Sequence, residues 1–558
     1  MTDTKPWLKY YDRSVPHSLR PYPQKTLVDI VTETAQQRPD HTALIFKGAK
    51  LTYHEFERLT NAFAAALVSL GVHKGDRVAI VVPNSPQGLI AQFGAWKAGA
   101  IAVPLNPVYT ERELESALNE CGAETVVVLT PFYHKLKTLQ PKTVLRRVIA
   151  TNIKEYLPLV LRVWFTLTKE KKEGHRIALQ AGDLWLSDLI DQHAHAPRPT
   201  VDVRPDDEAL LLFTGGTTGT SKAAIGTHHA LLCSGLQIHK WFGGVVEDWT
   251  DVILCVLPMF HVYGNAGVIA ISIVGHNPLA LVADPRNLAD LIKTIHKTHA
   301  TYFAGVPSLF NALINYPDVR SGKFSLKSVK GCTSGAAPLL AETKKRFEAF
   351  IGGPMVEGYA LTETMMGAAI TPLQGTYKAG SVGIPLSDVE MRIVDPEDDK
   401  RILGVKEIGE ITVRAPQLMK GYWQHPTETA NAIRDGWLHT GDIGYMDEDG
   451  YLFITDRMKD LIKPSGYQVW PREVEEVLAT HPAVAEVAVA GVPNEKQGEA
   501  VKAWIVLRAG QQATVDELRA YSRDKLAPYK VPKHIAFRDS LPKTLVGKVL
   551  RRELVKEG

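Results

Sequence analysis

The stretch LLFTGGTTGTSKAA, residues 211 to 224, contains the residue types that bind phosphate. Glycines let the backbone approach an anion closely, and consecutive N–H groups form a concave anion-binding surface. Threonine hydroxyls add further donors, and Lys222 adds a positive charge. The stretch is not a Walker loop, because two residues separate Gly219 from Lys222 and an alanine follows the lysine. It nevertheless predicts a loop that binds phosphate.

Three later stretches carry further chemically useful side chains. EGYALTET at 357–364 places an aromatic ring, a threonine and a carboxylate close together. GWLHTGDIGYMDEDGYLFITDRMKD at 436–460 contains Thr-Gly-Asp and, later, Asp-Arg. PKTLVGKVLRREL at 542–554 has a lysine, Lys548, in a predicted loop near the C-terminus. A single such motif is weak evidence, but four of them in one chain form a specific pattern.

In this order the four stretches resemble the adenylate-forming superfamily, which includes acyl-CoA synthetases, firefly-luciferase-like enzymes and peptide-synthetase adenylation domains. The resemblance runs from about residue 25 to the C-terminus, and the TGGTTG form is most similar to bacterial long-chain fatty acid–CoA ligases. The usual pattern has serine at Gly215, proline at Ser221, and glycine at Ala223 and Ala360. These departures remove no charge, so an active enzyme is expected.

The resemblance implies a reaction in two halves. A carboxylate attacks the α-phosphorus of ATP to give acyl-AMP and pyrophosphate, and the CoA thiolate then attacks the acyl carbon and releases AMP. The first half brings anions together, so Mg²⁺ and preorganised cationic side chains are needed to stabilise it. The expected cofactors and substrates are therefore ATP, Mg²⁺, CoA and a fatty acid.

The resemblance also implies how the nucleotide is held. Mg²⁺ is expected at Glu363, with help from Thr218. Tyr359 is expected to stack on adenine, Thr362 to reach the α-phosphate, and Asp442 and Arg457 to contact the ribose. The residues expected to bind the β- and γ-phosphates are Thr214, Gly215, Gly216, Thr217, Thr218, Gly219 and Lys222. The residues expected to form the other wall of the adenine site are Gly335, Ala336 and Ala337.

Four residues are expected to carry out the chemistry and the change between half-reactions. Lys548 is expected to contact the substrate carboxylate and the α-phosphate in the first half-reaction. Lys463, in LIKPSG, is expected to act in the second, and Lys459 is expected to be the hinge. His261, in LPMFHVYG, is expected where the acyl tunnel meets the CoA channel. A lone histidine is often an ordinary core residue, so this role depends on the resemblance.

The elements that position these residues alternate between helix and strand. EFERLTNAFAAALVSL at 55–70 has helical spacing, and RVAIVVP at 77–83 is typical of a buried strand. The alternation continues and predicts an α/β fold in which a large N-terminal domain, residues 1–458, contains parallel-sheet α/β subdomains. Charge and turn residues become dense after residue 456, and residues 459–558 are predicted to form a small mobile α+β domain.

The segment 133–198 breaks this alternation. Within it, EYLPLVLRVWFTLTKEKK at 155–172 combines bulky apolar residues with a basic end. The commoner interpretation is a core-packed helix with a solvated charged end, and the alternative is a helix that lies on a membrane surface. Pro158 argues against one continuous helix.

Composition restricts the partners. The formal net charge of +3 is too small to indicate nucleic acid. The four cysteines show no metal-ligand spacing, and buried reduced thiols are expected. No signal-peptide core is visible at the N-terminus, and the longest apolar runs are far shorter than the ~20 residues that span a bilayer. We expect a cytoplasmic protein, with peripheral contact to the inner face of the membrane and a homodimer both left open.

Three alternatives to a long-chain ligase stay open at this point. They are a CoA ligase for medium-chain or aromatic acids, an acyl-AMP ligase that delivers to a carrier protein, and a non-catalytic nucleotide-binding relative. The joint presence of Glu363, Asp442 and Lys548 argues against the last of these.

Overall fold

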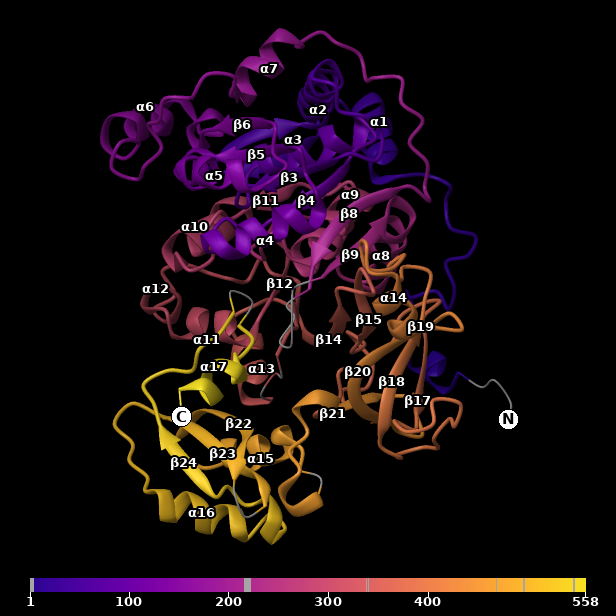
Figure 1. Cartoon of the computed structure of the whole chain (residues 1–558), viewed down its shortest axis with the longest axis vertical. Helices are drawn as coiled ribbons and strands as arrows, with labels where there is room; N and C mark the ends of the chain where they lie inside the picture. Colours follow the sequence, from indigo (N-terminus) through magenta and orange to yellow (C-terminus); the bar gives the residue numbers. More distant parts are fainter. Residues whose placement is uncertain are drawn as a thin grey trace.

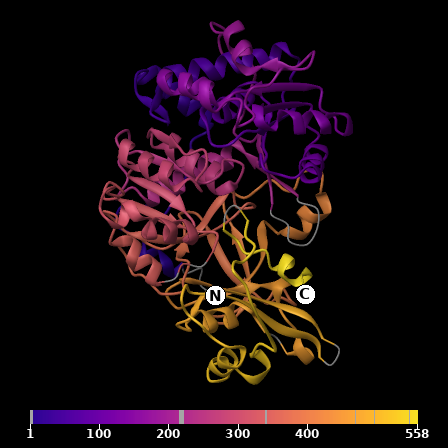
Figure 2. The same ribbon diagram turned by 90° about the vertical axis from the view of Figure 1, so that its left-hand side faces the viewer.

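The computed structural model describes residues 5–214, 222–337, 339, 341–467, 469–494, 497–544 and 547–557, apart from the side chains of residues 459 and 466. Within these residues the chain forms four sheets that follow one another from the top to the bottom of Figure 1. Figure 2 shows the same order from the side, with the C-terminal part, in yellow, at the end opposite to the N-terminal helices and strands, in indigo and purple.

The first sheet has seven strands and is parallel except at one edge, where β9 runs antiparallel to β8. Its strands, in sheet order, are β7 (Leu184–Trp185), β6 (Arg147–Thr151), β5 (Thr125–Leu129), β3 (Arg77–Val81), β4 (Ile101–Pro104), β8 (Glu208–Phe213) and β9 (Ala223–Thr227). The helices of this part are α1 (Leu27–Gln37), α2 (Tyr53–Ser69), α3 (Pro86–Lys97), α4 (Glu111–Cys121), α5 (Tyr133–Leu139), α6 (Leu159–Thr168) and α7 (Leu186–Gln192). The predicted helix at 55–70 and strand at 77–83 correspond to α2 and β3 and are confirmed.

The second sheet has nine strands, and its central strands are parallel. In sheet order they are β16 (Ile384–Pro385), β15 (Met366–Ile370), β14 (Met355–Leu361), β13 (Gly331–Ser334), β12 (Tyr302–Gly305), β10 (Ile253–Cys255), β11 (Leu279–Leu281), β1 (Thr42–Phe46) and β2 (Ala49–Thr52). The helices here are α8 (His228–Trp241), α9 (Ala270–Val274), α10 (Leu288–Thr298), α11 (Pro307–Asn315), α12 (Pro317–Arg320) and α13 (Ala341–Glu348), with a π-helix, η5, at Tyr263–Ile269.

A third sheet is antiparallel throughout, and the alternation of strands and helices did not predict it. Its strands are β17 (Glu390–Val394), β18 (Gly409–Arg414), β20 (Trp437–Met446), β19 (Ile433–Arg434) and β21 (Leu452–Arg457), and α14 (Pro426–Ala432) lies between β18 and β19 in the chain. Antiparallel neighbours need only short connections, so no crossover helix separates most of these strands. The third sheet brings Asp442 on β20 opposite Arg457 on β21.

The C-terminal part is a smaller α+β unit. It contains α15 (Pro471–Ala479), β22 (Val484–Asn494), β23 (Gly498–Leu507), α16 (Val515–Arg523), β24 (His534–Phe537) and α17 (Arg551–Lys556). From residue 462 onward the buried side chains form two hydrophobic clusters that are separate from the main core. The parallel N-terminal sheets and the smaller C-terminal unit agree with the predicted fold class, while the boundary at residue 459 stays a prediction.

Short 3₁₀ turns complete the described elements: η1 (Pro6–Tyr10), η2 (Thr130–Phe132), η3 (Gln140–Lys142), η4 (Ile153–Tyr156), η6 (Met458–Asp460), η7 (Pro464–Gly466) and η8 (Pro528–Lys530). Several helices begin at a capping box, in which the side chain of each of two residues accepts a hydrogen bond from the backbone N–H of the other. Thr52 with Glu55 starts α2, and Thr514 with Glu517 starts α16.

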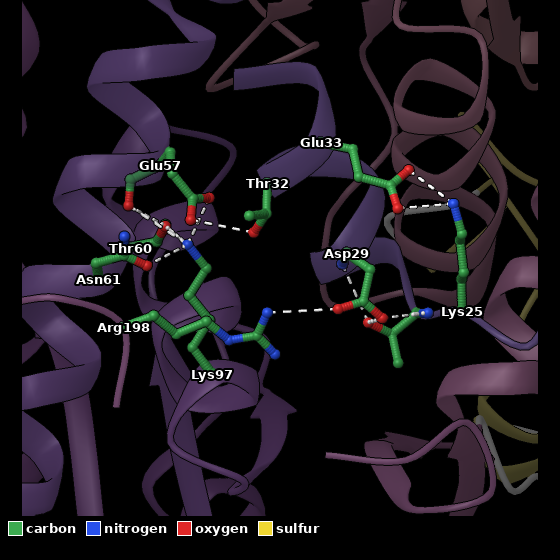
Figure 3. A network of polar contacts seen from close by, with 10 residues as sticks. Lys25, Asp29, Thr32, Glu33, Glu57, Thr60, Asn61, Lys97 and Arg198 are labelled. Carbon is green, nitrogen blue, oxygen red and sulfur yellow. Dashed lines mark hydrogen bonds and ion pairs between the residues drawn. The ribbon is translucent and has the colours of Figure 1, made fainter. Parts of the chain in front are cut away.

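A fully buried lysine joins α2 to α3 (Figure 3). Lys97 Nζ donates hydrogen bonds to Glu57 Oε2 at 2.6 Å, Thr60 Oγ1 at 2.7 Å and Asn61 Oδ1 at 2.6 Å. Burial lowers the pKa of Lys97 to about 8, and the charge of Glu57 opposes that shift. A buried charge is tolerated only when it is paired and hydrogen-bonded, so this network fixes how the two helices pack.

The segment 133–198 extends the first sheet by β6 and β7, but most of the apolar residues after Pro158 do not pack into the core. The chain turns through η4, and α6 begins immediately after Pro158, so the proline interrupts the helix as expected. Within α6 only Phe165 is buried. The interpretation of a core-packed helix is therefore wrong. Among the described residues, none of the helices is both long and apolar enough to cross a bilayer.

All four cysteines, Cys121, Cys233, Cys255 and Cys332, are buried and unpaired, as the composition predicted. Burial raises the pKa of each thiol, to about 12 for the first three. They are therefore protonated at neutral pH and are core residues.

Candidate active site

The predicted phosphate loop connects β8 to β9, the antiparallel pair at the edge of the first sheet. Thr214 N–H donates to Lys222 O at 2.8 Å, which closes the base of the loop. The predicted site residues Gly215, Gly216, Thr217, Thr218 and Gly219 lie outside the described residues. The described residues include the two ends of the loop, Thr214 and Lys222.

Lys222 faces the chain that enters α14. Its Nζ lies 5.4 Å from the centre of the Tyr422 ring and 3.8 Å from Glu428 Oε1. A cation over an aromatic face is attracted by the ring quadrupole. Tyr422 therefore holds the lysine that ends the predicted phosphate loop.

The same tyrosine contacts the predicted magnesium ligand. Tyr422 O–H donates to Glu363 Oε1 at 2.8 Å, and Met419 N–H donates to the backbone oxygen of Glu363 at 2.8 Å. Burial and the nearby charge of Glu363 raise the pKa of Tyr422 well above its usual value, so the phenol stays a donor. Lys222, Tyr422 and Glu363 form a row that links the phosphate loop to the turn after β14.

The surroundings of Glu363 fit a magnesium ion that is bound together with substrate phosphates. No cluster of three or more histidine, cysteine or acidic side chains that could hold a metal occurs in the described part of the chain. Mg²⁺ commonly takes one or two carboxylates plus phosphate oxygens and water. A single half-buried carboxylate beside a phosphate loop is this kind of donor set.

A second carboxylate lies where β20 and β21 pair. Asp442 is only 3% exposed, and its two oxygens have different partners: Oδ2 accepts from Tyr359 O–H at 2.7 Å, and Oδ1 forms an ion pair with Arg457 Nε at 2.8 Å. Burial, together with the charge of Asp442, raises the pKa of Tyr359 well above its usual value. Because each carboxylate oxygen has two lone pairs, Asp442 can still accept two hydroxyl donors.

The turn that carries Asp442 is held by a residue that the sequence analysis missed. Glu410 on β18 accepts from Gly441 N–H at 3.0 Å and lies 2.8 Å from His439 Nδ1. Thr440 Oγ1 meanwhile donates to Ile411 O at 2.7 Å. The pairing of β18 with β20 brings these groups together, so only knowledge of the third sheet could have found Glu410.

The predicted adenine wall follows β13. A Cβ atom placed on Gly335 would lie 3.0 to 3.2 Å from the ring of Tyr263, so the chain passes close to that ring. Ala336 has a φ of 66°, in the left-handed region. With Ala337 these residues lie beside β14, which carries Tyr359 and pairs with β13. The pairing of β13 with β14 thus puts the segments that carry Tyr359 and residues 335–337 on neighbouring strands, and Thr362 lies half-buried just after β14.

Glu357 is a second residue that the sequence analysis did not single out, although it starts the quoted motif EGYALTET. It is 6% exposed and accepts a hydrogen bond from Leu339 N–H at 3.1 Å. Burial raises its pKa to about 7. The sequence showed a glutamate two residues before Tyr359, but it did not show that this glutamate is buried.

Lys548 reaches the large domain. Burial, and then the charge of Lys548, lower the pKa of His261 to about 4. A Cβ on the preceding glycine, Gly547, would lie 3.2 Å from Ser308 Oγ at the start of α11. The fold thus brings the loop that carries Lys548 against the large domain, and the charge of Lys548 acts on His261, 287 residues earlier in the printed sequence.

Lys463 lies elsewhere. Its side chain is exposed, and its backbone N–H donates to Glu499 Oε2 at 2.7 Å on the β22–β23 hairpin. Of the two lysines predicted to act in turn, the structure therefore places Lys548 at the large-domain site and Lys463 on the surface of the C-terminal unit. The side chain of Lys459 lies outside the described residues, while its backbone belongs to η6.

Charged groups surround the predicted hinge. Arg551 Nη1 lies 3.1 Å from Asp460 Oδ2, and Arg551 Nη2 lies 2.8 Å from Glu475 Oε1. Asp456 accepts from Arg472 N–H at 2.7 Å, and its pKa is raised to about 6 by burial. These contacts tie the end of the third sheet to α15 and α17.

The arrangement combines a phosphate loop, a carboxylate suited to Mg²⁺, a carboxylate with donors suited to ribose hydroxyls, and a lysine delivered by the C-terminal unit. Such a site can bind a nucleoside triphosphate and stabilise charge at its α-phosphorus.

Two family models match the chain: the AMP-binding enzyme model at residues 31–423, and the AMP-binding enzyme C-terminal domain model at residues 473–548. The chain belongs to the AMP-binding enzyme family.

Similar proteins cover almost the whole chain. A long-chain-fatty-acid–CoA ligase of Bacillus subtilis (strain 168) is 40% identical over 562 aligned positions, covering 100% of this chain and 99% of that protein. One from Escherichia coli O157:H7 is 37% identical, covering 99% and 98%. Among solved structures, the anthranilate CoA ligase AuaEII in complex with anthranoyl-AMP is 25% identical with a TM-score of 0.83, covering 96% of this chain and 97% of that one.

Proposed function

We propose that this chain ligates a long-chain fatty acid to coenzyme A, driven by ATP and through an acyl-AMP intermediate, with release of AMP and pyrophosphate. The observation that carries this proposal is the similarity along the full length to long-chain-fatty-acid–CoA ligases, at 40% and 37% identity. The surroundings of Glu363, Asp442 and Lys548 support it, because carboxylates for Mg²⁺ and ribose and a lysine for the anionic centre are the groups that the two half-reactions need.

In the first half-reaction a carboxylate oxygen of the fatty acid attacks the α-phosphorus of ATP, and pyrophosphate leaves. The loop 214–222 binds the β- and γ-phosphates. Asp442 and Arg457 hold the ribose, and Tyr359 lies against adenine opposite residues 335–337. Mg²⁺, when bound at Glu363 with Thr218, neutralises phosphate charge.

Lys548 and Thr362 complete the first half-reaction. Lys548 contacts both the attacking carboxylate and the α-phosphate, and Thr362 contacts the α-phosphate. The neighbouring Gly547, on which a Cβ would lie 3.2 Å from Ser308 Oγ of the large domain, supports this position, as does the charge of Lys548, which adds to the lowering of the His261 pKa by burial. A preorganised cation stabilises the charge that develops at phosphorus.

In the second half-reaction the CoA thiolate attacks the acyl carbon, and the bond from that carbon to the AMP oxygen breaks. We propose that the small domain, residues 459–558, rotates about Lys459, withdraws Lys548 and brings Lys463 to the site. His261 lies at the junction of the acyl and CoA channels. The exposed side chain of Lys463 supports this, because a rotated small domain could bring an exposed lysine to the site.

The proposal includes a cytoplasmic location with peripheral contact at the inner face of the membrane. A long-chain fatty acid partitions into bilayers, so an enzyme that touches the bilayer meets its substrate at high local concentration.

A CoA-ligation assay across carboxylic acids from acetate to oleate, with coumarate included, tests the substrate class. We expect palmitate and oleate to have the highest kcat/KM. A preference for acetate, a medium-chain acid or coumarate would overturn the long-chain assignment. Formation of acyl-AMP with no CoA-dependent product would identify a ligase that delivers to a carrier protein instead.

A further inference from the structure

Helix α6 presents apolar side chains to solvent over rather more than half of its circumference. Leu159, Val160 and Leu167 are 76%, 79% and 80% exposed, and Leu161, Val163 and Trp164 are also exposed. Six of the large hydrophobic residues exposed in the described chain therefore lie in a single ten-residue helix. Figure 1 shows α6 at the periphery of the N-terminal half, far from the C-terminal unit.

Specific contacts hold α6 to the rest of the protein, so its exposed position is part of the fold. Phe165, its one buried residue, packs edge-on against His175 with ring centres 5.2 Å apart. His175 Nδ1 lies 2.9 Å from Thr130 Oγ1, next to β5. The buried Glu170 just after the helix accepts from Lys154 Nζ at 2.5 Å and from Asn152 Nδ2 at 3.2 Å. These contacts tie the C-terminal half of α6 and the residues after it to the chain that follows β5 and β6.

A wide exposed apolar helix face belongs against an apolar medium, and soluble monomers rarely expose a contiguous patch of this kind. Ten residues of α-helix are about 15 Å long, which is too short to cross a bilayer. The segment is therefore suited to lie in the interface between lipid headgroups and acyl chains.

The charges beside α6 fit one kind of surface. Between residues 154 and 176 there are six lysines and arginines and three glutamates. Two of those glutamates are already engaged, Glu170 by Lys154 and Glu173 by Lys169. Among the described residues, Lys171 and Lys172 are exposed and form no ion pair. The helix thus ends in an excess of positive charge, which complements anionic lipid headgroups.

We infer that α6 and its basic end form a docking site for an anionic lipid bilayer. Leu159, Val160, Val163 and Leu167 enter the acyl-chain boundary, and Lys171 and Lys172 contact phosphate groups. Trp164, whose ring lies 5.4 Å from Lys169 Nζ, takes the interfacial position that tryptophan prefers. The inference rests on the proposed peripheral contact and identifies the surface that makes it.

Vesicle flotation of the full chain tests this surface. The probes are vesicles of phosphatidylcholine alone and of phosphatidylcholine with phosphatidylglycerol. We expect the wild type to float with the anionic vesicles, and Leu159→Ser/Val160→Ser/Leu167→Ser to lose at least tenfold in binding. Lys171→Glu/Lys172→Glu should lose binding by more than tenfold at low salt, since each basic residue near an anionic surface contributes about fivefold.

Two controls keep the result specific. Arg523→Glu/Lys525→Glu removes the same number of positive charges from the exposed surface around the end of α16, at the opposite end of the molecule, and should bind like the wild type. Ligation of a fatty acid supplied in detergent should be equal in all four proteins, because α6 contacts none of the proposed nucleotide-site residues. If the wild type itself showed no ligation in detergent, that result would instead contradict the proposed function.

Three outcomes would overturn the inference. The wild type could fail to float, or the apolar variant could bind as well as the wild type. Alternatively, sedimentation could find a wild-type dimer that the apolar variant converts to a monomer while neither protein binds vesicles. That last result would make α6 a contact between two copies of this chain.

Discussion

The phenol oxygen of Tyr422 lies 2.8 Å from Oε1 of Glu363, and the ring of the same tyrosine lies 5.4 Å from Lys222 Nζ. One side chain thus contacts the proposed magnesium ligand and the lysine that ends the phosphate loop. Neither contact was predicted, because Tyr422 lies outside the motifs that carried the resemblance. It is a positioning residue for both groups.

We predict that Tyr422→Phe weakens the first half-reaction and raises its magnesium requirement. The variant keeps the ring beneath Lys222 but removes the hydrogen bond to Glu363. Hydrogen bonds to charged groups contribute about 1.5–3 kcal/mol, so ATP–pyrophosphate exchange at limiting Mg²⁺ should fall by about tenfold or more. Saturating Mg²⁺ should restore part of the rate. Tyr445→Phe, whose ring stacks on Phe453 instead, is the matched control. Unchanged exchange at every Mg²⁺ concentration would contradict the positioning role.

The two lysines should separate the half-reactions. Lys548→Ala removes a preorganised cation from the site, and its ATP–pyrophosphate exchange should fall by about 10²–10³. It should still convert supplied acyl-AMP and CoA to product. Lys463→Ala should keep exchange and lose speed in that second step. Each half-reaction is measured separately, with thermal melts to verify folding. Equal loss of both steps in both variants, with unchanged melts, would refute the rotation of the small domain.

The buried network of Lys97 should be important for stability (Figure 3). Lys97→Ala leaves the largely buried carboxylate of Glu57 without its partner, and removal of one partner of a buried pair costs about 3–5 kcal/mol. Lys97→Met/Glu57→Gln keeps most of the volume and removes both charges, so it should cost much less. Thermal melts compare the three proteins. A double variant less stable than Lys97→Ala would show that the ion pair is not the main contribution.

His228 should make the fold sensitive to mild acid. It is 2% exposed, its ring packs edge-on against Trp96, and burial lowers its pKa to about 4 from 6.5. The neutral form is favoured in the folded state, so this contribution is fully present above pH 6.5 and is lost as the pH falls toward 4. Between pH 7 and pH 5 the loss is about 2 kcal/mol.

Urea unfolding of His228→Phe at both pH values tests this contribution. The variant keeps a ring against Trp96 but cannot take up the proton, so its stability should fall less between pH 7 and pH 5. His54→Gln, at an exposed position of α2, should behave like the wild type. If the free energy of unfolding fell equally between pH 7 and pH 5 in His228→Phe and the wild type, other groups would be responsible for the acid sensitivity.

The sequence predicted those parts of the structure that depend on local pattern. Helical spacing located α2, and the apolar run after it located β3, because both signals lie within a single element. The sequence did not predict the third sheet, whose pairing of β18 with β20 joins residues about 30 positions apart. Glu410 was missed for this reason.

The site was predictable where chemistry is concentrated in short motifs. Asp442 and Arg457 were both named from sequence, yet their pairing with each other and with Tyr359 required the register of β20 and β21. The apolar character of α6 was visible, but composition alone could not decide between burial and exposure. Such a helix is compatible with a protein core and with a lipid surface alike.

The central claim is that a long-chain fatty acid is activated as its acyl-AMP before transfer to CoA. Palmitate with both carboxylate oxygens replaced by heavy oxygen tests it directly, with ATP, Mg²⁺ and CoA and mass spectrometry of the products. The attacking carboxylate oxygen becomes the bridge in acyl-AMP and stays with phosphorus when CoA attacks the acyl carbon. We predict that each AMP carries one labelled oxygen, that palmitoyl-CoA keeps the other, and that pyrophosphate carries none. Label in pyrophosphate, or unlabelled AMP formed together with palmitoyl-CoA, would contradict this mechanism.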